Sequence, residues 1–200
     1  MSGETLMPVE ISLACELNDR TSRLYDGRIS PEGIDLTVVP LEAEELFFRF
    51  SRFQDFDVSE MSMSSYMIAK DRGIDITAFP AFPSRAFRHG QIYIHTNSGI
   101  EKPEELKGKR VGIPEYQMTA TLWQRAILQH EYGVAPSDVT WIKSGLENAE
   151  REERFDLDLP SDVEIVVDSS YKSLNAMIRD GDIDTMLTAR TPDSFHDSES

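Results

Sequence analysis

Strand-like and helix-like segments alternate along most of the chain, and this alternation limits the fold more than any other feature. Short runs rich in β-branched residues predict strands, and apolar residues at helical spacing predict helices between them. We expect strands at 11–15, 34–41, 57–61, 74–79, 91–96, 110–113, 139–142, 163–167 and 185–188. We expect helices at 42–53, 62–72, 102–108, 116–132 and 173–179. The pattern predicts an α/β fold with mainly parallel sheets flanked by helices.

Two helices carry clear apolar faces. In the helix at 42–53 the face comprises Leu46, Phe47, Phe50 and Phe53, and we interpret it as core. The helix at 173–179 places Leu174, Met177 and Ile178 on one side in the same way. The acidic stretch at 144–160 has no such pattern, and we expect it to form an exposed loop.

The charge balance narrows the range of partners. The chain has 36 acidic and 20 basic residues, for a formal net charge of -16. Nucleic acid and anionic membrane surfaces are therefore not expected partners, since both need a basic face. Acidic residues spread along the whole chain are typical of a halophilic protein, because concentrated salt screens the repulsion between them. The alternative is an ordinary acidic cytosolic protein.

Motifs for metals and common cofactors are missing. The single cysteine, Cys15, excludes an internal disulfide and a cysteine-cluster metal site, and its apolar surroundings indicate a packing residue. The sequence has no HExxH, no G-x-G-x-x-G and no P-loop, so we expect neither metal nor cofactor. Without a leader or a membrane-spanning run, the sequence predicts a cytoplasmic protein.

Three segments carry most of the residues suited to chemistry. Residues 57–66 (DVSEMSMSSY) and 107–120 (KGKRVGIPEYQMTA) each read as a strand that runs into a helix N-terminus. Free N–H groups and the positive end of the helix dipole make such junctions suitable for anions. The proline-rich segment between them, which contains residues 82–89 (FPSRAFRH), supplies two arginines and a histidine. Together they predict a cleft for a small carboxylated molecule.

These three motifs resemble the 4,5-dihydroxyphthalate decarboxylase family, and the resemblance covers about residues 11–191. It implies the two-lobed fold of the type 2 periplasmic solute-binding proteins. We accordingly assign residues 1–90 to a first lobe, 91–191 to a second lobe and 192–200 to a disordered polar tail. Family members are usually longer and return to the first lobe, so we expect an incomplete first lobe. That lobe would favour a homo-oligomer or a second chain that completes it.

The resemblance also implies a substrate with two adjacent carboxylates. Arg85 and Arg88 are the main candidates to bind them, because guanidinium groups pair with carboxylates in a bidentate way. Arg20 is a further candidate, as is Arg190. The alternative is that these arginines form surface ion pairs. Side chains at the two helix starts are candidates to contact the ligand or simply to cap the helices: Ser62, Ser64, Ser65, Tyr116, Gln117 and Thr119.

Decarboxylation of an aromatic acid requires a proton at the ring carbon that loses the carboxylate. His89 is the candidate proton donor, and Glu60 or Glu115 would take the phenolic proton if burial raises its pKa. His89 as a purely structural residue is the alternative. Three functions therefore stay open: a decarboxylase converting 4,5-dihydroxyphthalate to 3,4-dihydroxybenzoate, a solute-binding protein for a small organic anion, and an inactive fragment of either.

Overall fold

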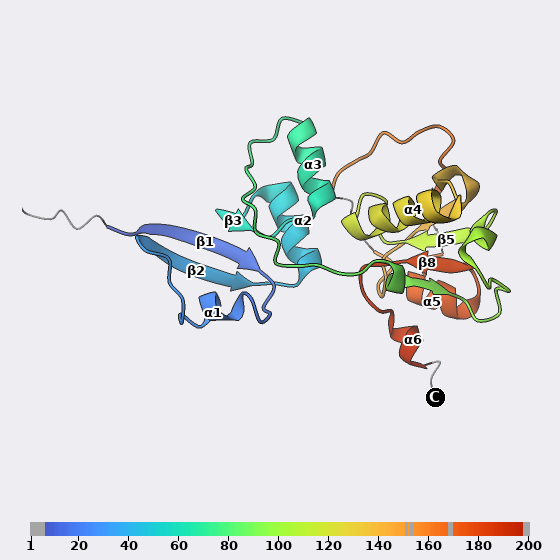
Figure 1. The fold of residues 1–200 in the computed structure, drawn as a ribbon, viewed down its shortest axis with the longest axis horizontal. Coiled ribbons are helices and arrows are strands. Elements are labelled where there is room, and N and C mark those ends of the chain that lie inside the picture. Colours follow the sequence, from blue (N-terminus) through green and yellow to red (C-terminus); the bar gives the residue numbers. More distant parts are fainter. Residues whose placement is uncertain (1–6, 151, 153, 168–169, 198–200) are drawn as a thin grey trace, which may run out of the picture. The chain divides into compact units, whose positions relative to one another are not determined.

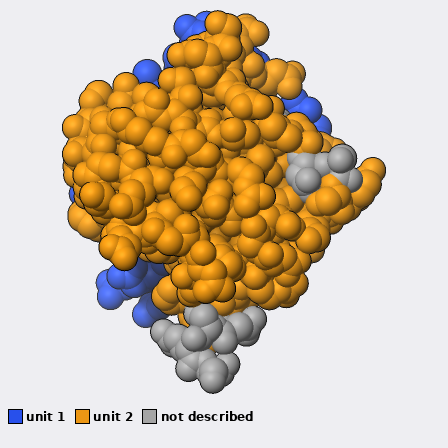
Figure 2. Space-filling view, turned by 90° about the vertical axis from the view of Figure 1, so that its right-hand side faces the viewer, with its two compact units in different colours: residues 1–85 blue, residues 86–200 orange. Residues whose placement is uncertain are grey.

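A computed structural model describes residues 7–150, 152, 154–167 and 170–197. The chain divides into two compact units, Met1–Arg85 and Ala86–Ser200. Figure 1 labels most of the helices and strands, and Figure 2 shows the surface of the second unit in orange. Each unit has its own sheet, and each is described by itself.

The first unit contains a three-stranded parallel sheet in the order β2-β1-β3. Its strands are β1 (Val9–Cys15), β2 (Ile34–Pro40) and β3 (Val58–Ser59). Its helices are α1 (Ser22–Tyr25), α2 (Ala43–Phe53) and α3 (Met63–Asp71). All three strands run the same way, so their carboxyl ends meet at one edge of the sheet.

The core of this unit is small. Ala14, Leu46 and Phe56 are buried, and half-buried apolar residues of β2 and α2 pack around them. The apolar face predicted for α2 is confirmed at Leu46 and contradicted at Phe53, whose exposed fraction is 64%. Phe53 is the last residue of α2 and packs edge-on against Phe48, with ring centroids 5.9 Å apart.

The strand predicted at 74–79 does not form. Its backbone turns back on itself and on α3 instead: Ile74 N–H donates to the carbonyl of Ala69, and Ile76 N–H donates to that of Ile74. Lys70 Nζ also donates to the carbonyl of Ile76. β-branched residues favour extended backbone, but a strand also needs a neighbouring strand.

The second unit contains a five-stranded sheet in the order β4-β8-β5-β6-β7, in which only the β4–β8 pair is antiparallel. Its strands are β4 (Ile92–Ile94), β5 (Arg110–Ile113), β6 (Thr140–Lys143), β7 (Ile165–Val167) and β8 (Thr185–Leu187). Its α-helices are α4 (Thr119–Tyr132), α5 (Leu174–Asp180) and α6 (Asp193–Asp197). The described part of this unit also contains the 3₁₀ turns η1 (His89–Gln91), η2 (Pro103–Leu106) and η3 (Pro136–Asp138).

Helices α4 and α5 cover opposite faces of this sheet (Figure 1). Val111 and Ile113 of β5 belong to the cluster that includes Leu128 of α4 and Trp141. Gly112, between them, faces α5, where a Cβ would lie 2.6 Å from Ile183 Cδ1. A side chain at this position would displace the terminal methyl groups of Ile183 and Leu174, so glycine allows close packing here. The predicted apolar face of α5 is confirmed, because Leu174, Met177 and Ile178 are all buried.

Two regions expected to be loose contain ordered segments among the residues that the structure describes. Within the acidic stretch at 144–160, Leu146, Arg154 and Phe155 are buried. In the predicted disordered tail, α6 packs near α5, and Ser194 N–H donates to Asn175 Oδ1 at 2.9 Å. Residues 198–200 lie outside the described part of the chain. Across the described ranges, no helix has the length and apolar character needed to cross a membrane.

Candidate functional site

In each unit, polar side chains follow the carboxyl ends of strands that run parallel to one another. In the first unit they follow β1 and β3, and in the second they follow β5 and β8. Parallel strands bring such residues together because their carboxyl ends lie at the same edge. The two clusters belong to different units and are taken in turn.

Glu60 directly follows β3 and is the central acid of the first cluster. Its backbone N–H donates to the carbonyl of Ala14 at 3.0 Å, which continues the pairing of β3 with β1. Burial raises the pKa of Glu60, and the negative charge of Glu16 raises it further. The buried Oε1 of Glu60 has no hydrogen-bond partner among the described residues. Glu60 is thus inclined to hold a proton.

The neighbouring residues are Cys15 and Arg20. Cys15 ends β1 and is 2% exposed, and burial together with the charge of Glu60 raises the pKa of its thiol. Arg20 points into solvent and pairs with Asp19, with Nη1 3.1 Å from Oδ1. The structure therefore places Arg20 in an exposed ion pair near the cluster, as the surface interpretation predicts.

Three serines stand at the start of α3. Ser62 occupies the N-cap position, but its side chain makes no capping hydrogen bond. Its Oγ instead lies 3.0 Å from Ser64 Oγ. Ser65 is fully buried, and its Oγ has no hydrogen-bond partner within the described residues. Simple helix capping does not account for this arrangement.

In the second unit, Glu115 follows β5 and is 2% exposed. Arg154 Nε donates to Glu115 Oε2 at 2.8 Å, and Gln117 Nε2 donates to the same oxygen at 3.2 Å. Glu115 is therefore held in a buried ion pair rather than poised as a proton acceptor. Sequence reasoning missed Arg154, because its acidic surroundings suggested an exposed loop.

Tyr116 turns into the core of the second unit. The guanidinium Cζ of Arg125 lies 3.6 Å from the centre of its ring, and the Trp141 ring meets it edge-on with centroids 5.7 Å apart. Burial raises the pKa of the Tyr116 hydroxyl and lowers the pKa of Arg125 to about 10. Tyr116 is a packing residue in this arrangement. Thr119 is the first residue of α4 and is half-buried.

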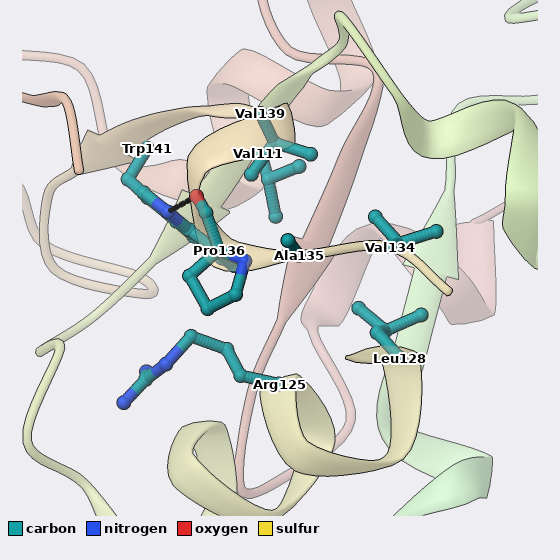
Figure 3. A pocket seen from close by; sticks show the side chains of 8 residues that line it. All are labelled: Val111, Arg125, Leu128, Val134, Ala135, Pro136, Val139 and Trp141. Carbon is teal, nitrogen blue, oxygen red and sulfur yellow. Dashed lines mark hydrogen bonds between the residues drawn. The ribbon is translucent and has the colours of Figure 1, made fainter. Parts of the chain in front are cut away.

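A small apolar pocket lies beside Arg125 (Figure 3). Val111, Leu128, Val134 and Trp141 line it, and Trp141 Nε1 donates to the carbonyl of Pro136 at 2.8 Å. It has room for about one water molecule, so it cannot hold an aromatic acid.

The three candidates of the proline-rich segment make different local contacts. Arg85, at the end of the first unit, is exposed and lies over the Phe82 ring at 5.6 Å. Arg88 is half-buried, burial lowers its pKa, and its Nη1 donates to Gln91 Oε1 at 2.7 Å.

His89 does not join the junction before α4. Its ring stacks on Phe87 at 4.7 Å, and its Nε2 lies 3.5 Å from Glu131 Oε2. Glu131 is near the carboxyl end of α4, about 18 Å along the helix axis from Thr119 at 1.5 Å per residue. The structure thus separates His89 from Glu115, which the prediction had grouped with it.

Sequence reasoning also missed the hydrogen bonds of a buried glutamine, Gln124. Gln124 is fully buried, and its Nε2 donates to the carbonyls of Gln91 at 2.7 Å and Thr188 at 3.0 Å. The available signal was its place in α4, four residues from both Ala120 and Leu128 in the buried stripe. A glutamine at such a position needs hydrogen-bond partners. No cluster of three or more metal-ligating side chains is present in the described ranges.

Solved structures with the same fold are periplasmic binding proteins. The aliphatic sulphonate binding protein SsuA from Escherichia coli superposes with a TM-score of 0.57 at 14% identity, over 96% of this chain and 54% of the other. The alkanesulfonate-binding protein SsuA from Xanthomonas axonopodis pv. citri, bound to MOPS, gives 0.52 at 15% identity, over 95% and 56%. The predicted α/β, periplasmic-binding-protein-like fold is confirmed.

The sequence comparisons define the family. Residues 30–156 match the model of the NMT1/THI5 like family, to which the chain belongs. The chain is also a member of the 4,5-dihydroxyphthalate decarboxylase family, as its motifs predicted. The Comamonas testosteroni enzyme of that name is 40% identical over 94% of this chain, and that of Pseudomonas putida is 38% identical over 98%. The chain spans 57% and 77% of their respective lengths.

Proposed function

We propose that this chain takes part in the non-oxidative decarboxylation of 4,5-dihydroxyphthalate to 3,4-dihydroxybenzoate and carbon dioxide. The observation that carries the proposal is the 38–40% identity to two decarboxylases of that name over nearly the whole chain. In the reaction the bond between ring and carboxylate breaks, its electron pair stays on the ring carbon, and a proton replaces the lost group.

Glu60 is our candidate for the acid–base step. A raised pKa lets a carboxyl group keep its proton closer to neutral pH and deliver it where negative charge develops. Glu60 has this property from burial and from Glu16, and its Oε1 is free of partners among the described residues. His89 is less suited because it lies beside Glu131, and Glu115 is less suited because it is paired with Arg154.

Arg88 is our candidate to bind a substrate carboxylate, with Arg85 as a second. Arg88 is half-buried, so its charge is less screened than that of a surface arginine. Ser65 adds a buried hydroxyl that has no partner in the described part of the chain, at the start of α3. Ser62, Ser64, Gln117 and Thr119 remain proposed ligand contacts.

The test is incubation of the purified chain with 4,5-dihydroxyphthalate, following carbon dioxide and 3,4-dihydroxybenzoate. We expect turnover that is lost in Glu60→Gln and retained in Glu32→Gln, which makes the same change at an exposed position of the first unit. His89→Gln is measured alongside. Turnover that survives in Glu60→Gln and disappears in His89→Gln would return the proton donor to His89.

A second candidate function is capture of a small organic anion without reaction. The fold it shares with two sulphonate-binding proteins favours this alternative. Its signature is a rise in melting temperature with 4,5-dihydroxyphthalate or an alkanesulfonate, and no product. Formation of 3,4-dihydroxybenzoate would show that the chain does more than bind the anion.

A further inference from the structure

Arg88 is held by a neutral group rather than by an acid. Its Nη1 donates to the carboxamide oxygen of Gln91 at 2.7 Å, and it forms no ion pair with a carboxylate within the described residues. In the same unit, Arg110 pairs with Asp184 and Arg154 pairs with Glu115. Arg125 also has no acidic partner among the described residues, but its guanidinium is buried against the Tyr116 ring, whereas Arg88 is half-buried and bonded to a neutral carboxamide.

Gln91 is itself fixed at both ends of its carboxamide. Its Nε2 donates to the carbonyl of Ala189 at 2.6 Å, so its Oε1 must face Arg88. Its backbone carbonyl accepts hydrogen bonds from Gln124 Nε2 at 2.7 Å and from Thr188 N–H at 3.2 Å. Since Gln124 is fully buried, this network has little freedom to rearrange.

The strand register places this network at the candidate site's edge of the sheet. Gln91 precedes β4, which is antiparallel to β8 with Ile92 opposite Leu187. The start of β4 therefore lies at the carboxyl end of β8. Strand β5, whose carboxyl end leads to Glu115, is the other neighbour of β8.

We propose that Gln91 is a positioning residue that orients the Arg88 guanidinium without neutralising it, so that the full charge of Arg88 is available to a carboxylate of an aromatic dicarboxylic acid. The inference rests on the proposed function, since it concerns the same ligand. A carboxamide oxygen accepts the hydrogen bond that fixes the guanidinium, whereas a carboxylate there would also cancel its charge. The other N–H groups of Arg88 have no hydrogen-bond acceptor among the described residues and are available to the ligand.

The decisive variant is Gln91→Glu, which keeps the shape of the side chain and adds a negative charge. That charge would pair with Arg88 and repel an anionic ligand. Binding of phthalate and 4,5-dihydroxyphthalate is measured by calorimetry, and turnover is measured separately. We expect the dissociation constants and KM to rise at least about tenfold, the loss of roughly one charge-assisted hydrogen bond, with kcat changed much less.

Two further variants make the result specific. Gln129→Glu adds the same charge on an exposed position of α4 and should leave binding unchanged. Gln91→Met removes both side-chain bonds but leaves Arg88 charged, so it should weaken binding less than Gln91→Glu. It also serves as the test if Gln91→Glu fails to fold: Gln91→Met binding that equals the parent would then overturn the role of Gln91.

The outcomes separate this inference from the proposed reaction. A parent chain that binds 4,5-dihydroxyphthalate without releasing carbon dioxide refutes the decarboxylation, while the binding comparison still decides the role of Gln91. Equal binding by the parent and Gln91→Glu overturns the inference. A parent chain that binds neither acid overturns it too, because Arg88 would then have no carboxylate ligand of this class.

Discussion

Arg154 donates to Glu115 across 2.8 Å, and this bond joins two residues 39 positions apart. Both side chains are almost fully buried, with exposed fractions of 4% and 3%. The pair therefore holds the acidic stretch at 144–160 against the junction between β5 and α4. Removing Arg154 should show how much the free energy of unfolding falls when the buried Glu115 carboxylate loses its cation.

We predict that Arg154→Met lowers the free energy of unfolding by about 3–5 kcal/mol, because it leaves the Glu115 carboxylate buried without its cation. The double variant Glu115→Leu/Arg154→Met should recover most of this loss, since it removes both charges together. Both tryptophans, Trp123 and Trp141, lie in the second unit, so tryptophan fluorescence during urea unfolding is the measurement. Equal losses in the single and double variants would contradict the prediction.

The raised pKa of Glu60 predicts a pH-dependent effect on stability. Above the ordinary value of 4.5 the folded chain keeps a proton that the unfolded chain has lost. The free energy of unfolding therefore falls as pH rises through this window and is level above it. Glu60→Gln should be more stable than the parent at pH 8 but not at pH 4, by far-ultraviolet circular dichroism. A gain of the same size at both pH values would rule out this cause.

The small core of the first unit predicts a sharp contrast between two positions of α2. Leu46 is fully buried, so Leu46→Ala should cost about 2–5 kcal/mol. Phe53 is exposed, and Phe53→Ala should cost no more than about 1 kcal/mol. Circular dichroism should report the loss in Leu46→Ala, while tryptophan fluorescence from the second unit changes little. Similar losses at the two positions would show that Phe53 belongs to the core.

The net charge of -16 predicts stabilisation by salt. Raising potassium chloride from 0.1 to 1 M shortens the Debye length from about 10 Å to about 3 Å and weakens repulsion among the acids. We expect a higher melting temperature in molar salt, as for a halophilic protein. Sorbitol at matched osmolality is the control, because it does not screen charge. A melting temperature unchanged by salt would favour an ordinary acidic protein.

Local patterns predicted most helices and strands, because the signal for each lies within the element. Leu174, Met177 and Ile178 form the buried face of α5 as expected, and β5 spans the predicted residues. The strand predicted at 74–79 does not form, because a strand needs a neighbouring strand and the local sequence does not specify one. The helix α6 was missed for a related reason: its contact with Asn175 comes from a distant segment.

The candidate site was predictable in its residue types and less so in its pairings. The sequence indicated both strand-to-helix junctions. At one of them the structure places Glu60, whose pKa is raised, and Ser65, which is fully buried. It did not indicate that Glu115 would meet Arg154. An ion pair between residues far apart in the sequence forms only in the folded chain, so no local sequence pattern predicts it.

The burial of Cys15 gives the first unit a reporter of its own. As the single thiol of the chain, at the end of β1 and 2% exposed, it should react with a thiol reagent only when that unit opens. Its labelling rate then measures the free energy of local opening in native conditions. A ligand bound at Glu60 and the α3 serines would slow this labelling. The labelling rate of Cys15 would then report how much of the protein has ligand bound, although Cys15 itself takes no part in the reaction.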